Sequence, residues 1–451
     1  MREVSIKDSM SGELRVLDPD EEVGIYACGP TVYSRIHIGN ARPFVIFSLF
    51  TRFLKDEGYR ARLAINVTDV NDKIYTAAAD AGTTSAELAA KMTATYFEDT
   101  GSLGLGRPDA EPLATETIQP IIDLIADLVE GDHAYASGGD VYFSVRSFKD
   151  YGKLSHRPMD DMEQGEGDDA GALKRDPLDF ALWKAHKPGE DTSWDSPWGP
   201  GRPGWHIECS AMAEQEFGEL PFTIHGGGSD LVFPHHENEI AQSEAARGKP
   251  LARIWMHNGM IETDSAKMSK SDGNIFQLHE AIDRYGAEAV VSFLISGHYR
   301  QPLAFSAEQL EQSVARVDRL RNFIRNRELE TEPGLEAGDA LDRFRDALAD
   351  DFNTPKAMRE LFDLVRLANQ EDDIQGAGSA VAEMLGLVGL GRLVEAGGDG
   401  PDEAALALLE QRQTARAEKD FEAADRIRDE LAGLGWQVRD SDDGPSLIPA
   451  G

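Results

Sequence analysis

Cysteine is scarce in this sequence, which has two, Cys28 and Cys209, among 451 residues. At most one disulfide could form, so a disulfide framework cannot hold the protein together. No uninterrupted apolar stretch of about 18 residues occurs, which excludes the usual pattern of a membrane-spanning helix. The first residues do not combine a basic start with an apolar run. We therefore expect a cytoplasmic protein whose two cysteines serve another purpose.

Basic residues are few in comparison with acidic ones. The sequence has 45 lysines and arginines against 81 aspartates and glutamates, giving a formal charge of −36. This balance argues against a protein that binds nucleic acid indiscriminately through phosphate contacts. A specific RNA partner stays open if basic residues cluster locally.

The first part of the chain has the order strand, glycine-bearing turn, helix, strand. EVGIYACG (22–29) predicts a buried strand, and ARPFVIFSLFTRFLKDEG (41–58) predicts an amphipathic helix with Pro43 in its first turn. RARLAINVTDVND (60–72) predicts the next strand. This order is typical of a parallel α/β sheet, which binds its ligand at the carboxyl ends of the strands. Cys28 and His37 fall at that edge.

The middle of the chain changes character twice. Helical periodicity dominates from about Glu87 to Glu130, and strand character returns in ASGGDVYFSVRSF (136–148). DDMEQGEGDDAGALKRD (160–176) is acidic and poor in large apolar residues, which predicts a surface loop. We interpret about 87–195 as a connective subdomain inserted into this α/β domain.

The predicted domains follow from these patterns. Beyond Ser306 the period is almost wholly helical, and EAGGDGPDE (395–403) has the composition of a linker. We expect a final short strand around WQV (436–438). The predicted units are a Rossmann-like catalytic domain at 1–305, a helical bundle at 306–395, a linker at 396–402 and a small mixed domain at 403–451.

A metal site is one interpretation of the cysteines. In HGGGSDLVFPHHENE, His235 and Glu239 are four residues apart and project from one face of a helix begun after Pro234. With Cys28 and Cys209 they would make a four-ligand zinc site. The alternative is two buried cysteines and a helix with ordinary surface charges. Spacing alone favours this alternative by about two to one, because the paired C-x-x-C spacing of secure zinc sites is missing.

Two further motifs suggest phosphate binding. HIGN (37–40) at a helix start offers backbone N–H groups, a positive dipole end and a histidine. KMSKSDGN (267–274) offers two lysines on a glycine-bearing loop. Taken singly, the first motif is more often a plain helix start and the second a solvated loop. Together they are more specific, because both could converge on a triphosphate that undergoes in-line attack.

These blocks occur in a familiar order. CGPTVYSRIHIGNARPF, NVTDVNDKI, GWHIECSAM, HGGGSDLVFPHHENEIAQSEA, WMHNGM and KMSKSDGN are followed by FLISGHYRQPLAFS, DALADDFNTPKAM and KDFEAADRIRDEL. On these motifs the sequence resembles the cysteinyl-tRNA synthetase family of class I aminoacyl-tRNA synthetases. The resemblance covers nearly the whole chain.

The resemblance implies a set of site residues. One zinc ion per chain would be bound by Cys28, Cys209, His235 and Glu239. The ATP phosphates and the charge that develops on them would be met by His37, Asn40, Lys267 and Lys270. The amino acid and adenosine would be contacted by Thr68, Trp205, His225 and Asp230.

The implied activity has two steps. Cysteine and Mg-ATP would form cysteinyl-adenylate, and the cysteinyl group would then pass to the 3′ end of tRNA(Cys). Zinc would select the substrate thiolate, so no editing domain is needed. An alternative is a related ligase that joins cysteine to an amino sugar in thiol-cofactor synthesis, but such relatives generally stop after the helical bundle. The family also implies a monomer.

For tRNA, the helical bundle and the last domain are the candidates. Two basic runs lie in them: Arg316, Arg319, Arg321, Arg325 and Arg327, then Arg412, Arg416 and Lys419. A solvated surface and an RNA site are about equally good interpretations of such runs in so acidic a chain. The family resemblance favours RNA.

Overall fold

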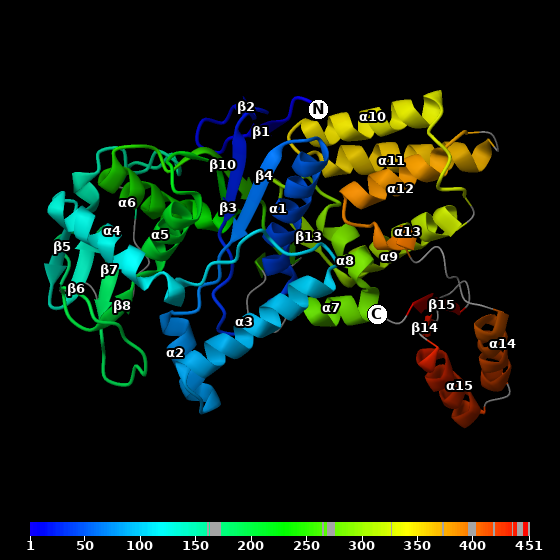
Figure 1. Cartoon of the computed structure of the whole chain (residues 1–451). Helices are drawn as coiled ribbons and strands as arrows, with labels where there is room; N and C mark the ends of the chain where they lie inside the picture. Colours follow the sequence, from blue (N-terminus) through cyan, green and yellow to red (C-terminus); the bar gives the residue numbers. More distant parts are fainter. Residues whose placement is uncertain are drawn as a thin grey trace.

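The computed structural model describes most of the chain (Figure 1). The described residues are 1–159, 162, 173–263, 266–267, 276–325, 327–371, 374–395, 403–417, 420–434, 436–439 and 445–449. Most of the predicted acidic loop and the whole predicted linker lie outside them. Among the described helices, none is both long and apolar enough to cross a membrane.

A four-stranded parallel sheet lies at the centre of the molecule, in the order β10-β9-β3-β4. Its strands are β3 (Glu22–Ala27), β4 (Arg60–Ile65), β9 (Phe222–Gly228) and β10 (Ala252–Asn258). The chain passes from β3 to β4 on one side and later adds β9 and β10 on the other. The strand order therefore reverses between β3 and β9, where such sheets bind ligands. This confirms the predicted parallel α/β sheet.

Helix α1 (Ile38–Asp56) connects β3 to β4 and begins with a capping box. Nδ1 of His37 accepts a hydrogen bond from the Gly39 N–H at 3.1 Å, and Oδ1 of Asn40 accepts one from the His37 N–H at 3.3 Å. The prediction that Pro43 lies in the first turn is wrong. The cap starts the helix three residues earlier than predicted, so that Pro43 lies inside it.

The backbone is tightly packed where β3 meets β9. The Cys28 N–H donates to the Gly226 carbonyl at 2.9 Å. A Cβ atom on Gly226 would lie 2.2 Å from Cζ of the fully buried Phe47 and 2.6 Å from the Met256 carbonyl oxygen. Only glycine therefore lets β9 approach both α1 and β10 at this point.

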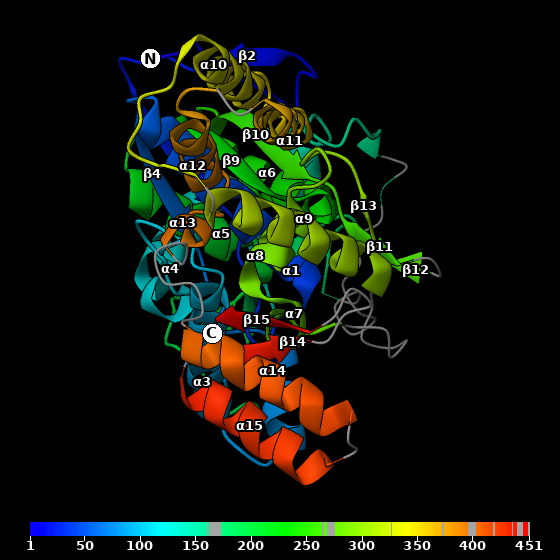
Figure 2. The ribbon, with the colours of Figure 1, turned by 90° about the vertical axis from the view of Figure 1, so that its right-hand side faces the viewer.

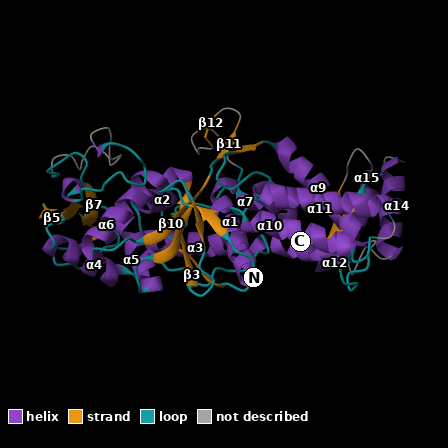
Figure 3. Cartoon of the chain, turned by 90° about the horizontal axis from the view of Figure 1, so that it is seen from above, coloured by secondary structure: helices purple, strands orange, loops and turns teal. Residues whose placement is uncertain are grey.

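A second layer is inserted between β4 and β9 and lies to one side of the sheet (Figure 3). Its antiparallel sheet has the order β5-β6-β7-β8 around a core that includes the fully buried Phe143, Phe180 and Trp183. The strand character predicted at 136–148 is confirmed, because β5 and β6 form a hairpin there. The strands are β5 (Ala134–Ser137), β6 (Asp140–Phe143), β7 (Phe180–Ala185) and β8 (Gly201–Pro203).

The helices of this region begin earlier than predicted. Oδ1 of Asn71 caps α2 by accepting the Lys73 N–H at 3.1 Å, so helix starts at Asp72 rather than near Glu87. The helices before and after the inserted sheet are α2 (Asp72–Ala81), α3 (Ser85–Ser102), α4 (Ile118–Glu130), α5 (Trp205–Phe217) and α6 (Glu237–Arg247).

Beyond β10 the chain is mostly helical, which confirms the predicted helical region. Arg345 attaches these helices to the end of α1, because it contacts the Glu57 carboxylate at 2.6 Å and the Asp56 carboxylate at 2.7 Å. The helices are α7 (Leu278–Tyr285), α8 (Ala287–Leu294), α9 (Ala307–Arg325), α10 (Leu335–Ala349), α11 (Thr354–Gln370), α12 (Ala377–Leu387) and α13 (Arg392–Glu395).

The C-terminal piece packs two helices against a short strand pair (Figure 2). It has a small core of its own, formed by Ala405, Leu409, Leu431 and Leu447. The sequence predicts one strand here, but the structure has two, paired antiparallel. The second strand comes from a tail dominated by acidic residues, glycine and proline, which carries little strand signal. The elements are α14 (Glu403–Ala417), α15 (Phe421–Gly433), β14 (Trp436–Arg439) and β15 (Ser446–Pro449).

Two small sheets complete the described structure. An N-terminal hairpin pairs β1 with β2, and a three-stranded sheet has the order β12-β11-β13. Their strands are β1 (Ser5–Lys7), β2 (Leu14–Val16), β11 (Ile261–Thr263), β12 (Ala266–Lys267) and β13 (Leu303–Phe305).

Gly226→Ala tests the close approach of β9 to α1. We expect it to lower the free energy of unfolding by about 1–3 kcal/mol, because the added methyl overlaps a buried ring and a backbone carbonyl. Gly101→Ala is the matched control, since its Cβ would meet nothing within 4 Å on helix α3. Urea denaturation of both variants checks this. Equal stability of the two variants would contradict the packing argument.

Candidate functional site

Cysteine, histidine and glutamate side chains converge where the strand order reverses. Cys28 directly follows β3, and Cys209 lies on α5. His235 and Glu239 follow β9 and are four residues apart. The ligand atoms of these four side chains all lie within 4.8 Å of one another, and all four are buried. The structure thus brings together the four residues predicted as metal ligands.

The local helix differs from the predicted one. His235 lies in a π-helical turn, Val232–His236, in which Phe233 has non-helical backbone angles. The α-helix itself begins at Glu237. His235 and Glu239 nevertheless face each other, with Nε2 to Oε1 at 3.2 Å. Single-turn π segments of this kind occur frequently at functional sites.

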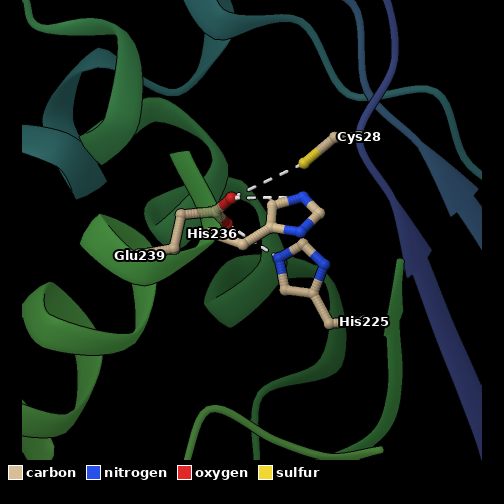
Figure 4. Close-up of side chains that lie close together, drawn as sticks. All are labelled: Cys28, His225, His236 and Glu239. Carbon is tan, nitrogen blue, oxygen red and sulfur yellow. Dashed lines mark hydrogen bonds and ion pairs between the residues drawn. The ribbon is translucent and has the colours of Figure 1, made fainter. Parts of the chain in front are cut away.

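The Glu239 carboxylate is the common partner in this cluster (Figure 4). Its Oε2 lies 2.7 Å from Nε2 of His225, and its Oε1 lies 3.6 Å from Sγ of Cys28. Nε2 of His236 is 3.9 Å from Oε1. A second possible ligand set, Cys28, His225, His236 and Glu239, therefore overlaps the first.

Further histidines, which the sequence analysis missed, surround the cluster. Nδ1 of His206 lies 2.9 Å from Nδ1 of His235. Nδ1 of His236 lies 2.7 Å from Nε2 of His257, whose Nδ1 is 2.8 Å from Oγ of Ser9. The pair His235-His236 is visible in the sequence, but His206 and His257 carry no spacing signal. Such outer partners fix the orientation of the rings that face a metal.

Burial sets the protonation of these groups. It lowers the pKa of His235 and of His206 to about 3, so both rings are neutral at pH 7. Burial raises the pKa of the Cys28 thiol well above its ordinary value. For Cys209 the hydrogen bond with Cys28 is the largest single influence and lowers the pKa, but burial and nearby carboxylates raise it overall.

The donor set suits a metal such as zinc. Two sulfurs, an imidazole nitrogen and a carboxylate oxygen are typical zinc ligands, and four of them match its tetrahedral preference. The set with Cys209 offers two sulfurs, whereas the overlapping set offers one. Softer ligands favour zinc over magnesium or calcium. The chemistry of the donors thus favours Cys28, Cys209, His235 and Glu239.

Two of the residues predicted to contact the amino acid, Trp205 and His225, pack against this cluster. Trp205 stacks on His235 with ring centres 4.3 Å apart and is 37% exposed, so it separates the cluster from solvent. His225 is fully buried and stacks on Trp255 at 4.5 Å. Thr68 is buried, and its N–H donates to the Pro30 carbonyl at 3.1 Å. Asp230 is exposed, just beyond β9.

One of the two predicted phosphate-binding elements, the HIGN motif, lies at the start of α1. Its first turn contains no acidic side chain, so the positive end of the helix dipole is not offset locally. His37 is half-buried and Asn40 is exposed. Lys267 belongs to β12, where only its backbone is described, and Lys270 lies outside the described residues.

Comparison with known proteins places this site in a family. Residues 15–315 match the model for the class I (C) tRNA synthetase catalytic domain, 343–390 the DALR domain, and 399–445 the cysteinyl-tRNA ligase anticodon binding domain. The chain is 44% identical over 458 residues to the cysteine–tRNA ligase of Coxiella burnetii, covering 98% of this chain and 99% of that one. The chain belongs to the cysteine–tRNA ligase family.

Other relatives agree with this assignment. The cysteine–tRNA ligase of Methylobacillus flagellatus is 46% identical over 438 residues, with 94% of each chain covered. Among solved structures, methionyl-tRNA synthetase of Mycobacterium tuberculosis, bound to methionyl-adenylate, has a TM-score of 0.64 at 15% identity. That alignment covers 86% of this chain and 96% of the other. It shows the shared fold of class I synthetases.

In this cysteine–tRNA ligase family member, several of the predicted tRNA-facing arginines have partners within the chain. Arg321 contacts Asp318 at 2.6 Å, and the Arg319 guanidinium lies 5.6 Å from the centre of the Phe362 ring. Arg412 is buried, and Lys419 lies outside the described residues. The basic runs are therefore less available to RNA than their sequence spacing indicates.

Cys209→Ser tests the metal site. Loss of one of the two sulfur ligands should weaken metal affinity by more than about 100-fold. This exceeds the loss that is typical when a residue hydrogen-bonded to a ligand is replaced. Metal content by atomic absorption, after dialysis against a mild chelator, measures this. Met212→Leu, a conservative change of a buried neighbour on the same helix, is the control. Wild-type metal content in Cys209→Ser would remove Cys209 from the ligand set.

Proton release on metal binding tests the protonation states. Because both thiol pKa values are raised and the His235 pKa is about 3, metal binding at pH 7 should displace about two thiol protons and none from His235. As long as the pH is below both thiol pKa values, the affinity for the metal should then rise about 100-fold for each unit by which the pH increases. Calorimetry in buffers of different ionisation enthalpy counts the protons. Release of none would mean that the thiols do not bind the metal.

Proposed function

We propose that this protein activates L-cysteine with Mg-ATP and transfers the cysteinyl group to the 3′ end of tRNA(Cys). The observation that carries the proposal is family membership along nearly the whole chain, including a match to the anticodon binding domain. The buried Cys/His/Glu cluster at the reversal of the sheet supports it. Cysteinyl-adenylate and pyrophosphate are the products of the first step.

In the adenylation step, the start of α1 receives the ATP phosphates. Backbone N–H groups and the helix dipole favour an anion there, and His37 and Asn40 contact it. Lys267 and Lys270 stabilise the charge that builds up when the cysteine carboxylate attacks the α-phosphorus. This catalysis uses positioning and electrostatics, without a covalent intermediate on the enzyme.

Selection of cysteine depends on the buried cluster. One zinc ion per chain is held by Cys28, Cys209, His235 and Glu239. A bound zinc ion supplies a soft Lewis acid that favours a thiolate sulfur over the hydroxyl of serine. Around it, Thr68, Trp205 and His225 orient the amino acid. Trp205 also excludes water, because it covers His235.

Contacts to adenosine and tRNA complete the proposal. Asp230, beyond β9, meets the adenosine. The helical bundle at 306–395 and the domain at 403–451 contact the tRNA. The ribose hydroxyl at its 3′ end accepts the cysteinyl group. We place the protein in the cytoplasm, as a monomer, in line with its role in translation.

Aminoacylation tests the function. Zinc-replete protein, ATP and labelled cysteine should charge total bacterial tRNA with base-labile cysteine, whereas labelled serine should give no product. The serine control isolates the sulfur selection expected of the metal site. Cysteine-dependent pyrophosphate exchange without charged tRNA would favour the amino-sugar ligase instead. Absence of both signals would contradict any activation of cysteine.

A further inference from the structure

Arg42 is a fully buried cation on α1. Among the described residues it has no carboxylate partner. Its guanidinium lies within hydrogen-bond distance of four backbone carbonyls instead. The two hydrogens of Nη1 are shared among Gly259 at 2.5 Å, Gln301 at 2.9 Å and Met260 at 3.3 Å, and Nη2 donates to His298 at 3.2 Å. A buried charge without a counter-ion is costly. This cost makes a purely space-filling role a poor explanation.

The carbonyls bound by Arg42 belong to the segments that lead into the three-stranded sheet β12-β11-β13. Gly259 and Met260 connect β10 to β11, which pairs with β12 at Glu262 and Lys267. Gln301 precedes β13, which pairs parallel with β11. Arg42 therefore fixes the position from which the β11–β12 hairpin starts.

The contact at Gly259 leaves no room for adjustment. A Cβ atom there would lie 2.2 Å from the Gln301 carbonyl carbon, and the Gly259 N–H donates to the Tyr299 carbonyl at 2.7 Å. The Leu303 N–H donates to the Met260 carbonyl at 2.9 Å. These backbone contacts join the two segments, and the Arg42 guanidinium attaches both of them to α1.

The chain after the hairpin returns to the start of the same helix. The Ile38 N–H donates to the Phe276 carbonyl at 3.1 Å, and the Leu278 N–H donates to the Ile36 carbonyl at 3.1 Å. His37 and Gln277 form an isolated antiparallel bridge. Both flanks of the segment that carries Lys267 are thus attached to the first turns of α1.

We propose that Arg42 is a positioning residue for adenylation. It holds the hairpin that carries Lys267 at a fixed position relative to the phosphate-facing start of α1. This rests on the proposed function, because it concerns how Lys267 reaches ATP. Arginine suits the role because its planar group presents donors in several directions to carbonyls on separate segments. Lysine keeps the charge, but its one nitrogen cannot occupy both the Nη1 position near Gly259, Met260 and Gln301 and the Nη2 position near His298.

Arg52 provides a matched control on the same helix. Its guanidinium also donates to backbone carbonyls, those of Gly386 and Leu105, each at 2.9 Å. These carbonyls belong to α12 and to the segment after α3, not to the hairpin. Arg52→Lys therefore tests loss of arginine–carbonyl contacts from α1 without displacing Lys267.

Cysteine-dependent pyrophosphate exchange is the first measurement. Arg42→Lys should lower kcat by about 10²-fold, as expected when a catalytic group is displaced by about 1 Å, with the KM for cysteine unchanged. Arg52→Lys should keep wild-type kcat, and both variants should keep wild-type metal content. If Arg42→Lys does not fold, Arg42→Gln replaces it, since it leaves no buried charge. Wild-type kcat in a folded Arg42 variant would overturn the proposal.

A double-mutant cycle with Lys267→Ala separates positioning from general destabilisation. If Arg42 acts through Lys267, Arg42→Lys should cost little further activity, less than about threefold, in the Lys267→Ala background. Losses that simply multiply would overturn the role of Arg42 while leaving the proposed function intact. A wild-type protein without cysteine-dependent exchange would overturn the proposed function and this proposal with it.

Discussion

A carboxylate without access to water needs hydrogen-bond or ionic partners from the protein. Glu239, which is fully buried, imposes this constraint on the centre of the molecule. Its two oxygens face His225, His235 and Cys28. Isolated buried charges are too costly to persist, so each of these partners has to come close. These contacts with Glu239 hold helix α6 against the ends of strands β3 and β9.

Strand β9 ends in three glycines, Gly226, Gly227 and Gly228, close to the cluster. Polar side chains occupy the reversal of the sheet, so the backbone itself must provide the packing between β9, α1 and β10. Gly226 allows this, because any side chain would overlap Phe47. Below the polar cluster the core is aromatic and aliphatic.

Much of the fold could be predicted from the sequence, for physical reasons. The strand–turn–helix–strand order follows from apolar periodicity, and the four predicted metal ligands do come together. Apolar periodicity placed the start of α1 at Ala41, because it does not report a local side-chain cap. The HIGN motif indicated the helix start at 37–40, where His37 caps α1. Strand β15 was missed because its pairing with β14 is a tertiary contact between weak segments. His206 and His257 approach the cluster only through tertiary packing.

The arginines show the opposite limit of sequence reasoning. Spacing placed Arg319 and Arg321 in one basic run and Arg412 in another, and the family resemblance favoured RNA for both. Each of the three has a contact or burial that sequence spacing cannot show. In a chain with so large an excess of acidic residues, a cation has many carboxylates within reach. Intrachain partners therefore compete with any external polyanion for each guanidinium.

Helix α1 has one end at the carboxyl edge of the parallel sheet, and its other end contacts the helical bundle. It has 19 residues, which corresponds to a rod of about 28 Å. Arg345 attaches the bundle to the far end of this rod through Asp56 and Glu57. The helix therefore fixes the separation of the two regions. The distance between these two regions is thus set by the number of residues in one helix.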